Sequence, residues 1–420
     1  MLAVSLPVFG GQTTPSPELI NTLNQAETLA RSGNQQGALE LLNRASEMKP
    51  ATAITEDGIG FLYAVLGLGQ QATQHFQKAI ALNDKYAPAH FHLGVAEWMA
   101  NDQQNGLAEL ERAVAIEPKS AEYRFRLGSA YLDSGAADKA VEQLKTAAGL
   151  DGSNVRVWTT LGQAAQAARN ATVAVDAYSH AVNLNPNDDL LRNTYALALI
   201  EIRQPDKAIA EAEKVLAHNP VNTAAVMNIG YAHLQTGDFP QAEETYRKAI
   251  QMDPASAAAY YDLAIALKMQ DKLDAAAEQL EQAIKIDPTI AEAHYTLGML
   301  AWQSGDFEKT AKEMRAAIAD RPDYAEAHYQ LGIVLKQSGD LDGALAELQE
   351  AIRLNPNTPG PFNTMGQILR LKGDIEGSKK AFAMGTKLNE EKNAQLANSL
   401  EQGMRGGMAP KPLPAPSSHQ

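Results

Sequence analysis

The chain contains no cysteine among its 420 residues. This absence excludes disulfide bonds, thiolate metal sites, cysteine nucleophiles and lipid-bearing cysteines. A cysteine-free chain is compatible with an oxidising or a reducing compartment, so the composition does not locate the protein. The sequence also lacks any apolar run that approaches the roughly 20 residues a helix needs to span a bilayer. We therefore expect no direct membrane insertion.

Positive charge is scarce. The chain has 36 Lys and Arg against 50 Asp and Glu, which gives a formal net charge of −14 at pH 7. Such a surface repels the phosphates of nucleic acids and anionic membrane surfaces, and no basic stripe interrupts it. We therefore expect no nucleic-acid partner, whereas a basic or neutral protein partner is accommodated more easily.

Motifs for catalysis and cofactor binding are missing as well. The nine histidines are scattered and form no HExxH pair. Two short glycine pairs, at 58–60 and 67–69, lack the third glycine and the preceding strand of a dinucleotide-binding loop. We therefore predict that the chain is not an enzyme and has no catalytic residue, metal site or cofactor.

The first residues allow two interpretations. Residues 2–9 (LAVSLPVF) form a short apolar run that a Gly/Thr/Pro/Ser segment follows. This run resembles the end of a truncated secretory signal, but no Lys or Arg precedes Arg31. The alternative is a flexible leader. A cytoplasmic location is favoured, and export to the periplasm remains open if residues 1–10 are a signal remnant.

What the sequence does contain is an internal repeat. Proline recurs at intervals of 34 residues or twice 34, and the two skipped places hold Asp84 and Gly152. The prolines are Pro50, Pro118, Pro186, Pro220, Pro254, Pro288, Pro322 and Pro356. Ten consecutive markers thus keep one register without an insertion, which chance does not produce.

Small residues keep the same register. Ten residues after these markers stand glycines that we predict to serve repeat packing: Gly60, Gly94, Gly128, Gly162, Gly230, Gly298, Gly332 and Gly366. Alanine recurs at two further places, for example at Ala140 and Ala147. Glycine inside a helix costs about 1 kcal/mol relative to alanine. We infer that the close approach of a partner helix offsets this cost.

Each unit is expected to form two helices joined by a turn. In the unit from Ala291, His294, Leu297 and Ala301 lie on one helical stripe. Gly305 then supplies the turn, and Pro322 ends the second helix because proline lacks the amide donor. Eleven such units run from residue 19 to about residue 392.

This pattern resembles the tetratricopeptide repeat, a 34-residue helix–turn–helix unit with a large residue, Leu-Gly, Tyr, Ala, an aromatic residue, Ala and Pro at fixed places. The unit from Ala121 carries Leu127, Gly128, Tyr131, Ala140, Leu144 and Ala147, and the unit from Val155 carries Trp158, Leu161, Gly162, Ala174, Tyr178 and Ala181. The resemblance covers residues 19–392. It implies an all-α, right-handed solenoid whose first helices line a concave face that binds peptides.

The flanking segments complete the predicted organisation. Residues 1–18 are a flexible leader or a signal remnant. Residues 393–404 carry Leu396, Leu400 and Met404 at helical spacing, so we expect a separate helix that caps the last repeat. Residues 405–420 are rich in Gly and Pro and are expected to be disordered.

Candidate ligand contacts lie on the stripe of each first helix that the packing within the unit does not use. The aromatic members are Phe91, Phe125, Tyr261, Tyr295 and Tyr329, and the cationic members are Lys268, Lys336 and Arg370. Tyrosine is favoured in recognition surfaces, and a cationic edge could hold an acidic group or a C-terminal carboxylate. The alternatives are that the aromatic residues pack against the neighbouring unit and that the cations are simply solvated.

Three functions remain open at this stage. The leading hypothesis is a protein–protein interaction scaffold that binds a partner protein or peptide along the concave groove. The first alternative is a self-assembly module that forms a homodimer. The second is the regulatory arm of an enzyme complex, which is disfavoured because only about 28 residues follow the last unit, too few for a catalytic domain.

Overall fold

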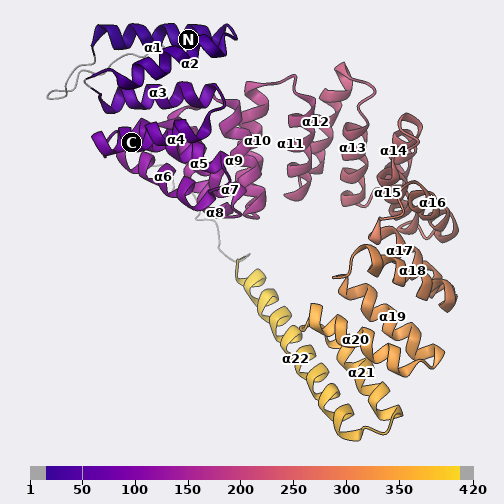
Figure 1. The fold of residues 1–420 in the computed structure, drawn as a ribbon. Coiled ribbons are helices and arrows are strands. Elements are labelled where there is room, and N and C mark those ends of the chain that lie inside the picture. The colour runs from indigo at the N-terminus through magenta and orange to yellow at the C-terminus, as the bar shows by residue number, and fades with distance from the viewer. Residues whose placement is uncertain (1–15, 50, 407–420) are drawn as a thin grey trace, which may run out of the picture. The chain divides into compact units, whose positions relative to one another are not determined.

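The computed structural model describes residues 16–49 and 51–406, and these residues form 22 helices and no strand (Figure 1). The helices are α1 (Pro17–Arg31), α2 (Gln35–Glu47), α3 (Ala53–Val65), α4 (Gly69–Leu82), α5 (Ala87–Met99), α6 (Gln103–Ile116), α7 (Ala121–Asp133), α8 (Ala137–Leu150), α9 (Val155–Ala167), α10 (Ala171–Leu184), α11 (Asp189–Glu201), α12 (Pro205–His218), α13 (Thr223–Thr236), α14 (Phe239–Met252), α15 (Ala257–Lys268), α16 (Leu273–Ile286), α17 (Ala291–Gln303), α18 (Phe307–Asp320), α19 (Ala325–Ser338), α20 (Leu341–Leu354), α21 (Pro359–Leu371) and α22 (Ile375–Gly406).

The chain divides into two compact units, Met1–Pro220 and Val221–Gln420, which we call the N-terminal and C-terminal units. In each unit an odd-numbered helix packs against the following even-numbered helix, and that helix packs against the next odd-numbered one. Each odd–even pair is one repeat, and consecutive pairs lie side by side (Figure 1). The predicted all-α solenoid of paired helices is therefore confirmed.

The turn between the two helices of a repeat needs a residue with positive φ. Seven repeats place glycine there, with φ between 75° and 85°: Gly33, Gly67, Gly135, Gly237, Gly305, Gly339 and Gly373. The other four use Asn101, Arg169, Arg203 and Asp271, with φ between 56° and 65°. All these residues follow one another at 34-residue intervals. Glycine adopts this conformation freely, whereas a side chain with Cβ is strained there.

The glycines predicted for repeat packing are all buried and face the second helix of their own repeat. A Cβ atom at each would lie 3.0 Å or less from the large side chain sixteen residues later, which is too close for contact. The pairs are Gly60–Phe76, Gly94–Leu110, Gly128–Leu144, Gly162–Tyr178, Gly230–Tyr246, Gly298–Met314, Gly332–Leu348 and Gly366–Phe382. The missing side chain on one helix thus makes room for a large one on its partner.

Alanine keeps the second helices close to their neighbours. Ala140 and Ala147 on α8 are fully buried, and the same holds for Ala344 on α20. Between these small residues stands the large side chain that fills the glycine gap, such as Leu144 or Leu348. Small and large residues therefore alternate at the helix–helix contact, which gives the core its close packing.

A buried polar side chain links both helices of a repeat to the loop that precedes it. His294 Nδ1 lies 2.7 Å from Glu313 Oε2, and its Nε2 lies 3.2 Å from the carbonyl oxygen of Pro288. His328 repeats this arrangement with a glutamate nineteen residues later and a carbonyl six residues earlier, as does His90. These histidines therefore join the two helices of a repeat and the preceding loop through hydrogen bonds.

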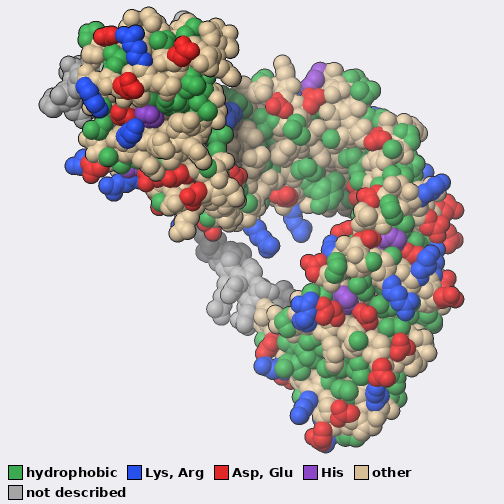
Figure 2. Space-filling view, viewed as in Figure 1, with side chains coloured by type: hydrophobic (Ala, Val, Ile, Leu, Met, Phe, Trp, Pro, Cys, Tyr) green, Lys and Arg blue, Asp and Glu red, His purple; other side chains and the backbone are tan. Residues whose placement is uncertain are grey.

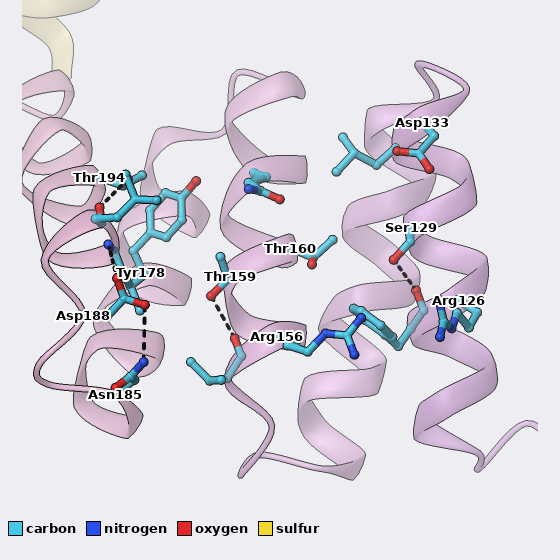
Figure 3. Close-up of a pocket in the computed structure, with 16 residues that line it drawn as sticks. Arg126, Ser129, Asp133, Arg156, Thr159, Thr160, Tyr178, Asn185, Asp188 and Thr194 are labelled. Carbon is cyan, nitrogen blue, oxygen red and sulfur yellow. Dashed lines mark hydrogen bonds between the residues drawn. The ribbon is translucent and has the colours of Figure 1, made fainter. Parts of the chain in front are cut away.

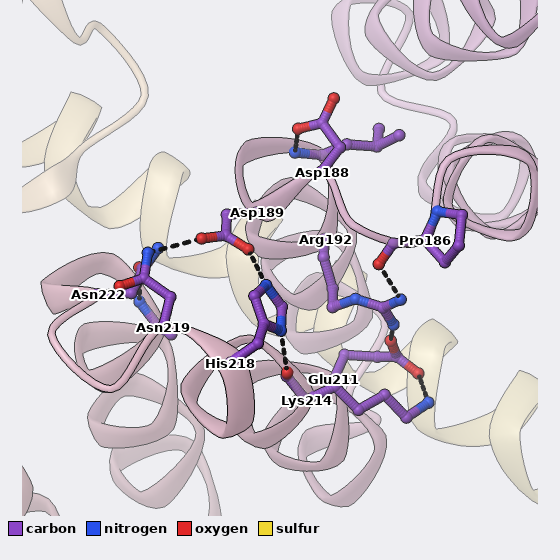
Figure 4. Close-up of polar contacts among 11 residues, drawn as sticks. Pro186, Asp188, Asp189, Arg192, Glu211, Lys214, His218, Asn219 and Asn222 are labelled. Atoms are coloured by element: carbon purple, nitrogen blue, oxygen red, sulfur yellow. Dashed lines mark hydrogen bonds and ion pairs between the residues drawn. The ribbon is translucent and has the colours of Figure 1, made fainter.

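Arginine replaces histidine at this place in α11 (Figure 4). The Arg192 guanidinium pairs with Glu211 on α12 and donates at 2.7 Å to the carbonyl oxygen of Pro186. Glu211 also accepts from Lys214 Nζ at 2.6 Å. Because the Arg192 and Glu211 side chains are only 10% and 14% exposed, the pair lies in a region that screens charge weakly.

The C-terminal end differs from the predicted organisation. Residues 393–404, expected to form a separate capping helix, continue α22 without a break after the last repeat. The last buried side chain described on this helix is Leu388, and residues 389–395 are exposed. Apart from residues 16–18 and 405–406, the predicted leader and tail lie outside the described residues.

Substituting a glycine that faces backbone of the partner helix tests the nesting of helices. A Cβ atom at Gly94 would lie 2.8 Å from the backbone oxygen of Gly106, so backbone must move. We expect Gly94→Ala to lower the free energy of unfolding by about 1–3 kcal/mol. The control is Gly149→Ala in α8, which meets nothing within 4 Å and should raise stability by up to about 1 kcal/mol. Thermal and urea unfolding measure both; equal effects would contradict the packing.

The turn positions give a second prediction. Arg203 has φ of 58° in the turn before α12, so Arg203→Gly should relieve strain. After allowing for glycine's larger unfolded-state entropy, we expect a gain of roughly 0.5–1 kcal/mol in unfolding free energy. Asn101→Gly is the control and should change less, because asparagine tolerates this conformation. A lower melting temperature for Arg203→Gly would refute the assigned turn geometry.

Candidate binding groove

Three first helices of the N-terminal unit, α7, α9 and α11, line a pocket of about 620 Å³ (Figure 3). They belong to successive repeats, so the pocket extends across the stack rather than into one helix pair. Its lining residues are Phe125, Arg126, Ser129, Leu132, Asp133, Val155, Arg156, Thr159, Thr160, Gln163, Tyr178, Asn185, Asp188, Leu190, Leu191 and Thr194. The pocket therefore combines apolar surface with hydroxyl groups and charges of both signs.

An aromatic ring and two arginines form one side of the pocket. Phe125 is buried at 5% exposure, and the Arg156 guanidinium carbon lies 5.3 Å from its ring centroid. Arg126 approaches the same ring at 6.0 Å and donates to Glu122 Oε1 at 3.2 Å. Arg156 has no acidic partner among the described residues. Its charge is held in place by the ring and remains available to a ligand.

The hydroxyl groups of the pocket are already oriented. Ser129, Thr159 and Thr194 each donate to the backbone carbonyl four residues earlier, at 2.8–2.9 Å (Figure 3). Because the hydroxyl proton is used, each oxygen presents its lone pairs to a neighbour. These three groups can therefore accept hydrogen bonds from a ligand but cannot donate without breaking an internal bond.

Two further polar groups of the pocket serve the fold. The Tyr178 hydroxyl donates to Gln166 Oε1 at 2.7 Å, and burial raises the pKa of Tyr178 to about 12. Asp188 accepts from the backbone nitrogen of Leu191 at 3.0 Å, which caps α11. Both groups are therefore engaged in hydrogen bonds that hold the wall of the pocket in place.

The structure places the predicted aromatic residues at the contacts between repeats. Phe125 lines the pocket, and Phe91 stacks on Tyr123 of the next repeat with ring centroids 4.6 Å apart. Trp98 and Trp302, on the same stripe, are half-buried against the core. Aromatic side chains on this face therefore contribute to stacking of the repeats as well as to exposed surface.

The three tyrosines of the C-terminal unit behave in the same way. Burial raises the pKa of the Tyr261 phenol, and Thr296 on the next first helix opposes that rise. Tyr295 packs on Tyr324 with ring centroids 4.9 Å apart. The Tyr329 hydroxyl packs against Gly360, because a Cβ atom added to this glycine would lie 2.7 Å from the hydroxyl oxygen. All three are half-buried, so each offers only part of its surface to a ligand.

The cationic residues on this stripe do not form a cluster. Lys336 Nζ donates to Gln367 Oε1 at 2.8 Å, Lys268 is half-buried and Arg370 is exposed. No ion pair or hydrogen bond joins the three side chains to one another in the described part of the chain. A shared carboxylate clamp at this edge remains a prediction without a supporting contact.

Sequence reasoning missed a polar column at the sixth place of the first helices. From the repeat at residue 87 onward its members are His92, Arg126, Thr160, Thr194, Asn228, Asp262, Thr296, Gln330 and Thr364. Three of them line the pocket. Burial raises the pKa of Asp262 from its ordinary 3.8 to about 6. An unbroken run of polar residues at a 34-residue interval was the signal that could have found this column.

The outer surface shows charge of both signs. On the face drawn in Figure 2, acidic and basic side chains are interspersed with apolar ones over both units. Across residues 16–49 and 51–406, no helix is both long and apolar enough to cross a bilayer. Nor do three or more His, Asp or Glu side chains gather there in a metal-binding arrangement.

Comparison with solved structures gives the following likenesses. A tetratricopeptide repeat protein from Parabacteroides merdae has a TM-score of 0.50 at 15% identity, covering 59% of this chain and 98% of that chain. The crystal structure of yeast Tom70 gives 0.45 at 14% identity, covering 92% and 96%. The crystal structure of MamA gives 0.38 at 26% identity, covering 40% and 97%. No curated protein matches the sequence.

Two family models match the sequence itself. The tetratricopeptide repeat domain of cytochrome c-type biogenesis protein H matches residues 142–256. A general tetratricopeptide repeat model matches residues 104–155, 227–291 and 295–359. Together the two models span more than half of the chain. The chain belongs to the tetratricopeptide repeat family.

Proposed function

We propose that the chain binds an extended segment of a partner protein along the face formed by its first helices, with the pocket between α7, α9 and α11 as a principal contact. Tetratricopeptide repeats are scaffolds for protein–protein interaction, and this chain consists largely of them. The observation that carries the proposal is the pocket of about 620 Å³ shared by three successive repeats.

The geometry of the pocket favours an extended ligand. Packed helices lie about 8–10 Å apart, so a ligand that crosses three first helices spans about 20 Å. An extended peptide rises roughly 3.3 Å per residue and covers this span with about six residues. A compact small molecule would fill only part of a pocket that runs across the stack.

The side chains of the pocket match the groups of a peptide. Thr159 and Thr194 present acceptor oxygens that suit backbone N–H groups. Arg156 offers a guanidinium to a carbonyl or a carboxylate. Leu190, which is 78% exposed, supplies apolar contact at the wall of the pocket. Its exposure on α11 gives no benefit to the fold and suits a partner's apolar side chain.

Two pocket variants test the proposal without harming the core. Leu190→Asp places an acid in the first turn of α11, where it is compatible with the helix dipole, and Arg156→Ala removes an unpaired cation. We expect both to reduce capture of partner proteins by about tenfold. The measurement is quantitative mass spectrometry of proteins retained from cell lysate by the immobilised chain.

Val221→Asp is the matched control, because Val221 is 77% exposed but lies in the loop before α13. It should retain the wild-type set of partners. Capture that is unchanged in both pocket variants would rule out the groove. A concentration-independent dimer in light scattering, combined with no retained partner, would favour self-assembly instead.

A further inference from the structure

One wall of the pocket recurs two repeats later, in the C-terminal unit. Adding 68 residues to Tyr178 and Thr194 gives Tyr246 and Asp262. The packing recurs as well, since Tyr178 lies against Gly162 and Tyr246 lies against Gly230. A Cβ atom added to Gly162 would lie 2.5 Å from the nearest atom of the Tyr178 ring. The distance from a Cβ atom added to Gly230 to the Tyr246 ring would be 2.6 Å. The same backbone framework therefore holds both sets of side chains.

The recurring wall has lost an internal hydrogen bond. The Tyr178 hydroxyl donates to Gln166, but the corresponding residue for Tyr246 is Leu234, which has no acceptor. Tyr246 is fully buried, and its hydroxyl oxygen has no hydrogen-bond partner in the described part of the chain. A buried hydroxyl without a partner is costly, so this wall lacks an interaction that the first pocket makes within the fold.

The second difference is a carboxylate. Thr194 uses its hydroxyl on its own helix, whereas Asp262 at the same place has neither an ion pair nor a hydrogen bond to any described residue. Withdrawal from water raises the pKa of Asp262 to about 6. Burial also raises the pKa of Tyr246, and the charge of Asp262 adds to that effect. A cation close to Asp262 would favour the charged carboxylate and so lower its pKa.

An exposed aromatic ring completes the surroundings. Tyr231 stands where the first pocket has Gln163, and it is 47% exposed. Its phenol is near enough to influence the pKa of Tyr246. The carboxylate attracts ammonium and guanidinium groups by its charge. The open aromatic face attracts the same groups by the cation–π interaction. The net charge of −14 attracts a basic segment over longer distances.

We propose that Asp262, together with Tyr231, is the point on the C-terminal unit where a lysine or arginine side chain of the bound segment docks. This inference rests on the proposed function and names the partner chemistry of its groove. The partner is a segment that carries basic residues, and the bound cation replaces the interactions that the fold leaves unmade at this wall.

The partial burial of Asp262 has a measurable consequence for the free protein. Its folded pKa of about 6 lies above the ordinary 3.8, so the native state holds the proton more tightly. The contribution of Asp262 to the free energy of unfolding should therefore fall as pH rises from about 4 to about 6. It should stay lower at higher pH. Asp262→Asn should melt at a higher temperature than wild type at neutral pH and at nearly the same temperature near pH 4. Identical melting differences at both pH values would show that Asp262 is not buried.

Binding is tested with defined probes. A fluorescent peptide of alternating alanine and lysine, about ten residues long, spans three first helices at roughly 3.3 Å per residue. The comparison peptide replaces lysine with glutamine. Fluorescence anisotropy with the full chain should show binding of the lysine peptide only. We expect Asp262→Asn to weaken this binding by about tenfold, because the lysine ammonium of the peptide loses its carboxylate partner.

Asp271→Asn is the control for overall charge. Asp271 is exposed in the turn after α15 with φ of 60°, a conformation that asparagine also tolerates. This variant should change affinity by less than about twofold. Equal weakening in the two variants, or no weakening in Asp262→Asn, would overturn the proposal, as would equal binding of the lysine and glutamine peptides.

The two proposals fail in different ways. Suppose that Leu190→Asp loses partner capture while the Asp262→Asn protein binds the lysine peptide normally. This result would support binding in the groove and refute only the cation site at Asp262. Capture that is unchanged in Leu190→Asp and Arg156→Ala would remove groove binding itself.

Discussion

The whole structure depends on the close approach of two helices within each repeat. A glycine in the first helix leaves a gap that the large side chain sixteen residues later fills, as at Gly162 and Tyr178. Because the gap has the size of a missing side chain, any larger residue would force the helices apart. The distance between the two helices of a repeat follows from this contact.

The same contact explains how one framework supports different chemistry. At Tyr178 the hydroxyl is satisfied within the fold, whereas at Tyr246 it is not, although both rings occupy equivalent gaps. Residues of the first helices that point away from the partner helix are free to vary, so a threonine in one repeat becomes Asp262 two repeats later. Recognition can thus change along the stack without any change in its packing.

Most of the fold could be predicted from the sequence because each repeat makes mainly local contacts. Pro322 and Gly305 mark boundaries that depend only on the backbone of their own segment. The long α22 was not predicted, since no proline or glycine near residue 392 stops the helix and the apolar spacing suited either arrangement. The site was harder, because the exposure of Tyr295 or Arg156 depends on residues from other repeats. Asp262 was missed because aromatic and cationic residues were sought, whereas its importance arises from burial without a partner.

The turns between helices are not equivalent, and this has a consequence for how the array opens. Arg169 and Arg203 occupy positive-φ positions in adjacent repeats of the N-terminal unit, where most other repeats have glycine. In a linear stack, stability is close to a sum of terms for single repeats and for their junctions. Strain confined to neighbouring turns therefore lowers the single-repeat terms of α9–α10 and α11–α12 without changing those of the flanking repeats.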